Sequence, residues 1–232
     1  MTKKAIIALI FLSGLVLLLF PHGVRTYYTY ENNKMFKEFK AETSELFKPE
    51  SKSKLEEVKR KMETYDIELK KAGMEITDPF EENKENLKSL KEILNLDEGE
   101  AFGMVEIPKL NLVVPLYLSV SDEALYEGVG HVGGSSLPIG GKSTHTVIAG
   151  HRGSWTQEIF QHVDKLENGD LFYIHTRAKL LTYRVIGKVI IHPSNTEMLE
   201  IQTGKDLATL ITCHPYGSNA QRLLIQGERV QD

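Results

Sequence analysis

The feature that most constrains the fold is a run of short apolar segments, separated by turn residues, from Ala101 to the C-terminus. Val, Ile, Leu and Tyr dominate the segments, and Gly, Pro, Asn and Ser lie between them. The segments are Met104–Ile107, Leu112–Leu118, Thr146–Ala149, Leu171–His175, Leu181–Ile191, Ala208–Thr212 and Leu223–Gln226. Many short strands joined by turns are typical of an all-β barrel or sandwich. Within this half, Gln157–Val163 favours a short helix.

The preceding region, residues 31–96, is rich in Lys and Glu and poor in β-branched residues, which favours helix. One apolar stripe with alternating spacings of three and four consists of Leu55, Val58, Met62, Tyr65 and Leu69. Two shorter amphipathic helices are suggested by Phe36 and Phe39 and by Leu87, Leu90 and Leu94. Because Pro49, Gly73 and Pro79 interrupt the pattern, we expect packing within the chain and not a free-standing coiled coil.

The N-terminus carries an apolar run from Ala5 to Phe20, preceded by Lys3 and Lys4 and followed by Pro21. A run of about 16 residues lies between a signal-peptide core and a full membrane span. Since no small-residue cleavage site follows, we expect an uncleaved anchor with a cytoplasmic N-terminus. The predicted organisation is an anchor in residues 1–24, a helical region in 25–100 and a catalytic barrel in 101–232.

Charge and cysteine content exclude several classes of function. The net charge of -4 is small, and no Lys/Arg block of the kind that binds nucleic acid is present, so we expect no nucleic-acid partner. A single Cys rules out an intramolecular disulfide and a Cys-rich metal site. No metal or organic cofactor follows from the motifs.

Three residues able to perform acyl transfer stand at the ends of predicted strands: His151, Cys213 and Arg222. Taken singly, each has an ordinary structural explanation: a loop-capping His, a buried Cys, a surface Arg. Together they supply an acid/base, a nucleophile and a cation for the oxyanion. His214 is the competing histidine, but adjacent residues on an extended strand point to opposite faces, so His151 is preferred.

At these residues the chain resembles the sortases, and more narrowly the class C, pilin-polymerising sortases. Residues 209–213 fit the family's Thr-Leu-x-Thr-Cys signature. The Gly-His-Arg-Gly turn at 150–153, the Arg-Leu-Leu start at 222–224 and the Ser-Leu-Pro-Ile-Gly-Gly stretch at 136–141 follow the same pattern. The resemblance covers roughly residues 100–230. It implies a mainly β fold, an eight-stranded sortase barrel with N-terminal helices and a membrane anchor.

The resemblance also implies the reaction. Sortases of this type cleave a Leu-Pro-x-Thr-Gly-like sorting signal between Thr and Gly and hold the Thr on the cysteine as a thioester. It assigns catalysis to Cys213, His151 and Arg222, and substrate binding to Thr212 and Ser143. The implied partners are pilin subunits or surface proteins with such a signal, and the acceptor amine is most often a pilin lysine. The implied location is the membrane of a Gram-positive bacterium, single-pass, with the catalytic domain outside.

The subclass depends on Asp78-Pro79-Phe80. Proline disfavours helical geometry at Asp78, so this segment is a loop or turn. Class C enzymes carry an Asp-Pro-aromatic lid ahead of the barrel, which implies that Asp78 engages Arg222 while Phe80 packs on Cys213. An ordinary turn between helices is the alternative. Class C chains commonly continue into a second membrane span, whereas this sequence stops at Asp232: it is truncated, or it relies on its N-terminal anchor.

Three other functions remain open at this point. A housekeeping sortase, which joins surface proteins to peptidoglycan, uses the same chemistry without a working lid. A catalytically silent, membrane-tethered binder of sorting signals belongs to a different class. A papain-type protease fits poorly, because the order of the motifs and the residues around them differ.

Overall fold

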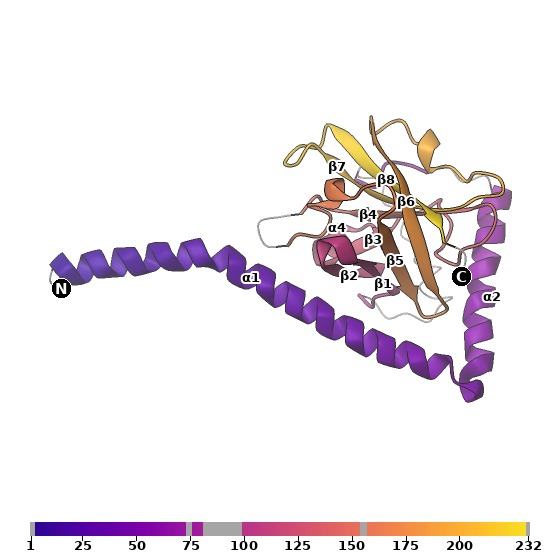
Figure 1. Ribbon diagram of the computed structural model, residues 1–232, viewed down its shortest axis with the longest axis horizontal. Helices are drawn as coiled ribbons and strands as arrows, with labels where there is room; N and C mark the ends of the chain where they lie inside the picture. The colour runs from indigo at the N-terminus through magenta and orange to yellow at the C-terminus, as the bar shows by residue number, and fades with distance from the viewer. Residues whose placement is uncertain (1–2, 73–75, 81–98, 154–156, 231–232) are drawn as a thin grey trace.

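The C-terminal part of the chain forms a closed barrel, with two long helices on its N-terminal side (Figure 1). The computed structural model describes residues 3–72, 76–80, 99–153 and 157–230. Eight strands occur in this described part: β1 Gly103–Ile107, β2 Leu112–Tyr117, β3 Val129–His131, β4 Thr144–Gly150, β5 Leu171–Thr176, β6 Leu180–Ile191, β7 Asp206–His214 and β8 Gln221–Arg229. Around the barrel their order is β1-β2-β3-β4-β7-β8-β6-β5. The predicted mainly β, eight-stranded barrel is confirmed.

Short helices lie between these strands. They are α4 Asp122–Glu127 and the 3-10 turns η2 Pro108–Leu110, η3 Val163–Lys165 and η4 Glu197–Leu199, while η1 Pro49–Ser51 precedes the barrel. Each of the seven predicted segments forms a strand. The strand that the pattern missed, β3, has 3 residues, too few to show an alternation.

The short helix predicted at Gln157–Val163 is wrong. This segment forms turns and then enters η3. Its backbone makes turn-type bonds within the segment and also bonds to the end of β4: the Phe160 amide donates to the His151 carbonyl at 3.0 Å. The Gln157 side chain donates to the Tyr126 carbonyl at 2.9 Å. Since Ile159 and Phe160 are both buried, tertiary packing outweighs local helix preference here.

Two pairings position the rim where the predicted site lies. Strands β4 and β7 are parallel neighbours, with Ala149 opposite Ile211 as their last register pair. Both strands therefore end at the same edge of the barrel. Strand β8 runs antiparallel to β7 and places Arg222 directly opposite Cys213.

Two apolar clusters meet at β7, because successive side chains of a strand point to opposite faces. Ala208 and Leu210 belong to the larger cluster, which holds the core of the barrel. Ile211 belongs to a second cluster that includes Ile76, with the Phe80 side chain packed against it. The segment before the barrel thus covers the outer face of β7.

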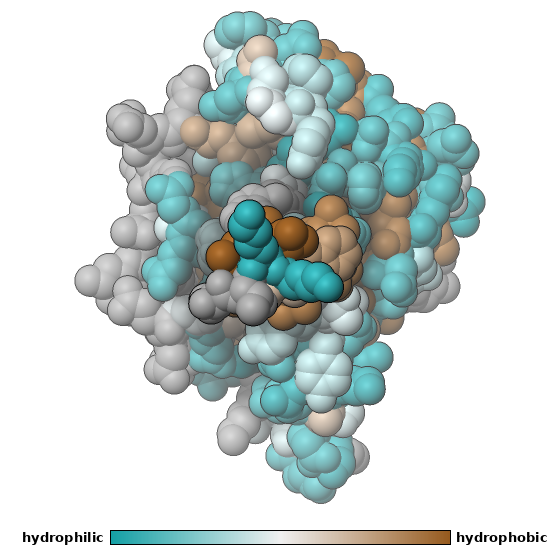
Figure 2. Space-filling view, turned by 90° about the vertical axis from the view of Figure 1, so that its left-hand side faces the viewer, coloured by the Kyte–Doolittle hydropathy of each residue, from teal (hydrophilic) through white to brown (hydrophobic). Residues whose placement is uncertain are grey.

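Helix α1 spans Lys3–Leu46 without interruption, with Pro21 inside it. The separate short helix expected around Phe36 and Phe39 is therefore wrong: both residues belong to α1, and the boundary predicted after residue 24 falls within this helix. A proline in a helix interior is tolerated with a bend, and α1 bends along its length (Figure 1). Its N-terminal part is long and apolar enough, by length and composition, to cross a membrane. Figure 2 shows this part end on, in front of a largely hydrophilic face.

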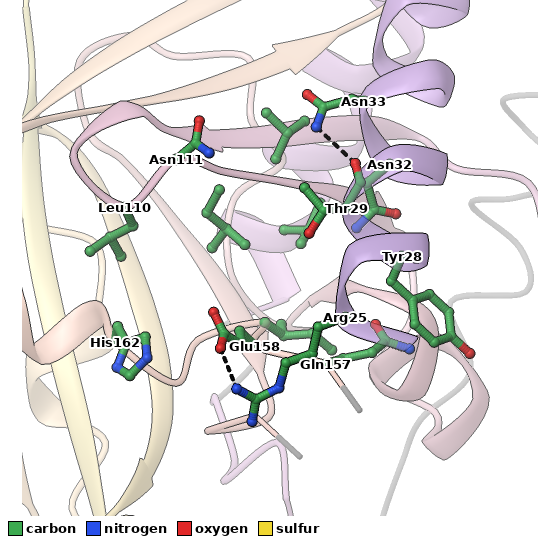
Figure 3. Close-up of a pocket in the computed structure, with 14 residues that line it drawn as sticks. Arg25, Tyr28, Thr29, Asn32, Asn33, Leu110, Asn111, Gln157, Glu158 and His162 are labelled. Carbon is green, nitrogen blue, oxygen red and sulfur yellow. Dashed lines mark hydrogen bonds and ion pairs between the residues drawn. The ribbon is translucent and has the colours of Figure 1, made fainter. Parts of the chain in front are cut away.

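The second half of α1 packs on the barrel. Phe36 and Phe39 are buried with Met104, and the Phe36 ring meets the His175 ring edge to face at 4.7 Å between centroids. Nearer the apolar part, Arg25 pairs with Glu158 at 2.7 Å, beside a cavity of about 80 Å³ between α1 and the barrel (Figure 3). The anchor helix is thereby tied to the loop that follows β4.

Helix α2, Lys52–Ala72, carries the predicted apolar stripe. Leu55, Met62 and Leu69 are buried, and Leu55 and Met62 belong to the larger cluster of the barrel. Asp66 accepts a hydrogen bond from the Leu137 amide at 2.8 Å. The predicted packing of this helix on the following domain is therefore present, and the predicted Leu87–Leu94 helix lies outside the described residues.

Candidate active site

The rim of the barrel brings His151, Cys213 and Arg222 together. His151 directly follows β4, and Cys213 is the penultimate residue of β7. Since Ala149 pairs with Ile211, His151 and Cys213 each lie two residues beyond the last register pair of parallel strands. Arg222 is the cross-strand partner of Cys213 on β8. The sequence-predicted constellation is thus one cluster in space.

The Arg222 side chain is 2% exposed and meets the carboxylate of Asp78 at two points. Its Nε donates to Asp78 Oδ1 at 2.7 Å and its Nη2 to Oδ2 at 2.5 Å. Its Nη1 donates to the carbonyl oxygens of Asn219 and Gln221, both at 3.0 Å. The contact expected between Asp78 and Arg222 is present, and it occupies the Nε edge of the guanidinium.

Phe80 lies beside His151 and Arg222, and its expected packing on Cys213 stays a prediction. Its ring centroid is 6.1 Å from that of His151, and the Arg222 guanidinium carbon is 5.1 Å from the Phe80 centroid. Pro79 is buried, and Asp78 is 7% exposed. The ring contacts of Phe80 are therefore with the two residues that flank the thiol.

Cys213 is a half-buried free thiol, whose Sγ lies 3.3 Å from Asn219 Oδ1. Burial raises the pKa of this thiol, the Asp78 carboxylate raises it further, and Arg222 and Arg152 lower it. The net pKa shift is upward. With Asp78 in place, the thiol is held in its protonated, less nucleophilic form.

Sequence reasoning missed two residues of this rim, Asn219 and Arg152. Asn219 follows the nucleophile by six positions in a polar loop, without a motif to mark it. Arg152 is 8% exposed and donates to the Cys213 carbonyl oxygen at 3.3 Å. Its position inside the Gly-His-Arg-Gly turn was the available signal.

The two predicted substrate-binding residues lie in different places. Thr212 precedes the nucleophile and is fully buried, and its Oγ1 has no hydrogen-bond partner among the described residues. Ser143 lies before β4, at the other end from His151 of a strand that is itself about 20 Å long. There its hydroxyl accepts from the Gly204 amide at 2.9 Å. The structure does not bring Ser143 to the catalytic rim.

Other buried histidines have structural roles. His145 lies between the Glu200 carbonyl and the Thr209 hydroxyl, at 2.9 and 2.7 Å. His131 lies 3.0 Å from the Ser136 carbonyl. Within the described ranges, no group of three or more His, Cys, Asp or Glu is arranged to hold a metal ion.

Comparison with known families identifies the barrel. Residues 105–230, more than half of the chain, match the family model of the sortase domain. The chain belongs to the sortase family, which comprises cysteine transpeptidases.

Solved structures narrow the similarity to class C enzymes. Streptococcus pneumoniae sortase C, whose crystal structure bears on catalysis and pilin substrate specificity, is 39% identical in sequence to this chain. The match covers 86% of this chain and 97% of that chain, with a TM-score of 0.76. Clostridium perfringens sortase C, solved with the C-terminal cell wall sorting motif, is 34% identical, and the match covers 86% of this chain and 99% of that chain with a TM-score of 0.70.

A sequence relative outside class C supports the family as well. Sortase D of Bacillus subtilis is 30% identical over 58% of this chain and 66% of its own length.

Proposed function

We propose that this chain is a lid-gated class C sortase. It cleaves Leu-Pro-x-Thr-Gly-like sorting signals between Thr and Gly and joins the Thr to a lysine amine of a pilin subunit. The observation that carries this proposal is the two-point contact of Asp78 with Arg222, beneath a Phe80 ring that lies over His151. The similarity to S. pneumoniae sortase C, whose crystal structure bears on pilin substrate specificity, supports the same subclass.

The first half-reaction uses Cys213 and His151. The Cys213 thiolate attacks the Thr carbonyl carbon, a C–S bond forms, and the carbonyl electron pair moves to oxygen. When the intermediate collapses, the C–N bond to Gly breaks and His151 gives its proton to the departing amine. The Thr remains on Cys213 as a thioester, with His151 neutral.

The second half-reaction restores the enzyme. The incoming amine attacks the thioester carbon, and His151 takes the proton that the amine loses. Cys213 leaves as the thiolate when the C–S bond breaks, so a new amide is formed and the ion pair of Cys213 with His151 is regenerated.

Arg222 meets the negative charge that develops on the carbonyl oxygen in both halves. A guanidinium keeps its charge at any working pH and offers two parallel donors to an oxygen ligand. In the closed state Asp78 accepts from Nε and Nη2 of Arg222. The oxyanion and Asp78 therefore compete for the same edge of the guanidinium, so the lid must leave before the reaction begins.

The N-terminal helix supports a membrane location. Its apolar part is long enough to span a bilayer, and the ion pair of Arg25 with Glu158 begins the barrel contacts a few residues beyond that part. We infer an N-terminus in the cytoplasm and a catalytic domain on the outer face of a Gram-positive cell, close to the membrane. Sorting-signal proteins are the partners in this arrangement.

The test is a mass measurement on the full chain in detergent micelles with a Leu-Pro-x-Thr-Gly-type peptide. The panel contains the native protein, Cys213→Ala as a control, and the double variant Asp78→Ala/Phe80→Ala. A thioester that requires Cys213 and grows when the lid is opened supports the proposal. An equal adduct in native and lid-opened protein points to a housekeeping sortase. No adduct with any sorting peptide points to a silent binding module.

A further inference from the structure

Arg152 joins the turn that carries the acid/base to the end of the strand that carries the nucleophile. It directly follows His151, and its side chain reaches across to the end of β7. Its Nη1 lies 3.3 Å from the Cys213 carbonyl oxygen and 3.2 Å from His214 Nδ1. The residue after His151 therefore contacts the residue after Cys213.

The segment between β4 and β5 also holds the Arg152 guanidinium. Its Nε donates to the Gln161 carbonyl at 3.2 Å, and its Nη2 pairs with Asp164 at 3.3 Å. At 8% exposure, Arg152 has little freedom to move. A planar group with donors on three sides is well suited to hold several acceptors in one fixed arrangement.

The β4–β7 ladder brings His151 and Cys213 to the same edge of the barrel but stops before it reaches them. The last register pair of β4 and β7 is Ala149 with Ile211, and both catalytic residues lie beyond it. The bonds of Arg152 to Cys213 and His214 therefore supply a direct link between the turn after β4 and the end of β7 that the ladder does not supply.

The contact also engages the ring of His214. A guanidinium only donates hydrogen bonds, so Nδ1 of His214 is the acceptor in this contact. His214 is thereby engaged as an acceptor beside Arg152, and the role of acid/base stays with His151.

We propose that Arg152 is a positioning residue: it fixes His151 relative to Cys213 and places a positive charge beside the thiolate. This inference rests on the proposed roles of Cys213 and His151. Besides His151, the other charged or titratable groups around the thiol are Arg222 on β8, Asp78 of the lid, and His214. Because Arg222 lies on the opposite strand, the contribution of Arg152 is separable by mutation.

The experiment compares Arg152→Gln and Arg152→Lys in the full chain, with Asp164→Asn as a matched control that removes an ion pair of the same guanidinium. Three quantities are measured: the pH profile of iodoacetamide alkylation of Cys213, the kcat and KM for a fluorogenic sorting peptide, and the melting temperature. Since Cys213 is the one cysteine of the chain, intact mass reports its alkylation without interference.

For Arg152→Gln we expect kcat to fall about 10- to 100-fold with KM within about twofold, because misplacement of reacting groups costs rates of this order. Its alkylation midpoint moves to higher pH, since a cation beside the thiolate is lost. Arg152→Lys keeps the midpoint near that of the native protein but loses kcat, because an ammonium cannot hold the same set of acceptors. Asp164→Asn stays within about threefold of native kcat.

A purely structural role would give a different result. If Arg152→Gln lowers the melting temperature but keeps the native kcat and alkylation profile, the inference is wrong. If the Arg152 variants do not fold, His214→Asn and His214→Ala decide: Asn retains an acceptor for Arg152 and should keep more of kcat than Ala, and equal loss in both overturns the inference. If the native chain forms no thioester, the proposed function fails, while the alkylation profiles still test the charge of Arg152.

Discussion

Asp78 and Arg222 form a buried, two-point ion pair, with Nε–Oδ1 and Nη2–Oδ2 distances of 2.7 and 2.5 Å. Their side chains are 3% and 2% exposed, although the residues are 144 positions apart in the chain. Such a pair is geometrically specific, and removal of one partner leaves an uncompensated charge. In this site that charge regains water only if the lid moves away. The pair is therefore both a closing contact and a point at which opening can be induced.

Asp78→Ala should raise the rate at which a sorting peptide acylates Cys213, by about tenfold or more, since loss of a buried pair costs several kcal/mol of lid closure. The rate of thioester formation is measured by rapid quench and intact mass. Thr77→Ala, at the exposed neighbouring position, is the matched control and should behave as the native protein. Equal rates in all three proteins would show that this contact does not gate the site.

The pH dependence of Cys213 reactivity should shift when the lid carboxylate is removed. Burial and Asp78 both raise the pKa of the thiol, so Asp78→Asn should move the midpoint of iodoacetamide alkylation to lower pH. At a fixed pH near neutrality, the thiolate fraction and the alkylation rate then rise. Cys213→Ala defines the background, and a midpoint that moves to higher pH would contradict the assignment.

Docking of α2 on the barrel should contribute measurably to stability. Met62 is fully buried in the larger cluster, so Met62→Ala should lower the free energy of unfolding by about 2–5 kcal/mol. Ile67 lies on the same helix but is 52% exposed, so Ile67→Ala is the control and should change it by less than about 1 kcal/mol. Urea denaturation measures both. Similar values for the two variants would mean that α2 is not part of the folding unit.

Buried histidines should make the fold sensitive to mild acid. Burial lowers the pKa of His131 to about 4, and it also lowers the pKa of His145. The unfolded chain binds protons at pH values where the folded chain does not, so stability is complete above about pH 6.5 and falls as the pH drops toward about 4. The lowered pKa of His131 alone reduces the free energy of unfolding by about 2 kcal/mol as the pH falls from about 6.5 to about 5.

Urea denaturation at several pH values measures this slope. In His131→Asn the slope should be smaller than in the native protein, whatever the change in stability at neutral pH. His192→Asn is the control, because this exposed histidine directly follows β6. An unchanged slope in His131→Asn would contradict the predicted linkage.

Local sequence was sufficient to predict most of the strands and three residues that the structure brings together at the rim, His151, Cys213 and Arg222. Alternation and turn residues are short-range signals, so they marked strands such as β6 and β7 but missed the three-residue β3. They also missed the continuation of α1 through Pro21, since a proline inside a helix can bend it without ending it. The helix predicted at Gln157–Val163 is wrong because tertiary contacts outweigh local helix preference there: the Phe160 amide bonds to the His151 carbonyl.

The sequence by itself determined which chemistry is available: a lone thiol in a Thr-Leu-x-Thr-Cys run, a histidine after one strand, an arginine opening another, and an Asp-Pro-Phe turn. Only the tertiary structure decided how these groups meet. The parallel register of β4 and β7 puts His151 beside Cys213, and a long-range contact puts Asp78 on Arg222. It also separated Ser143 from the rim and brought Arg152 into it. Such contacts depend on strand register and loop packing, which residues near in sequence do not encode.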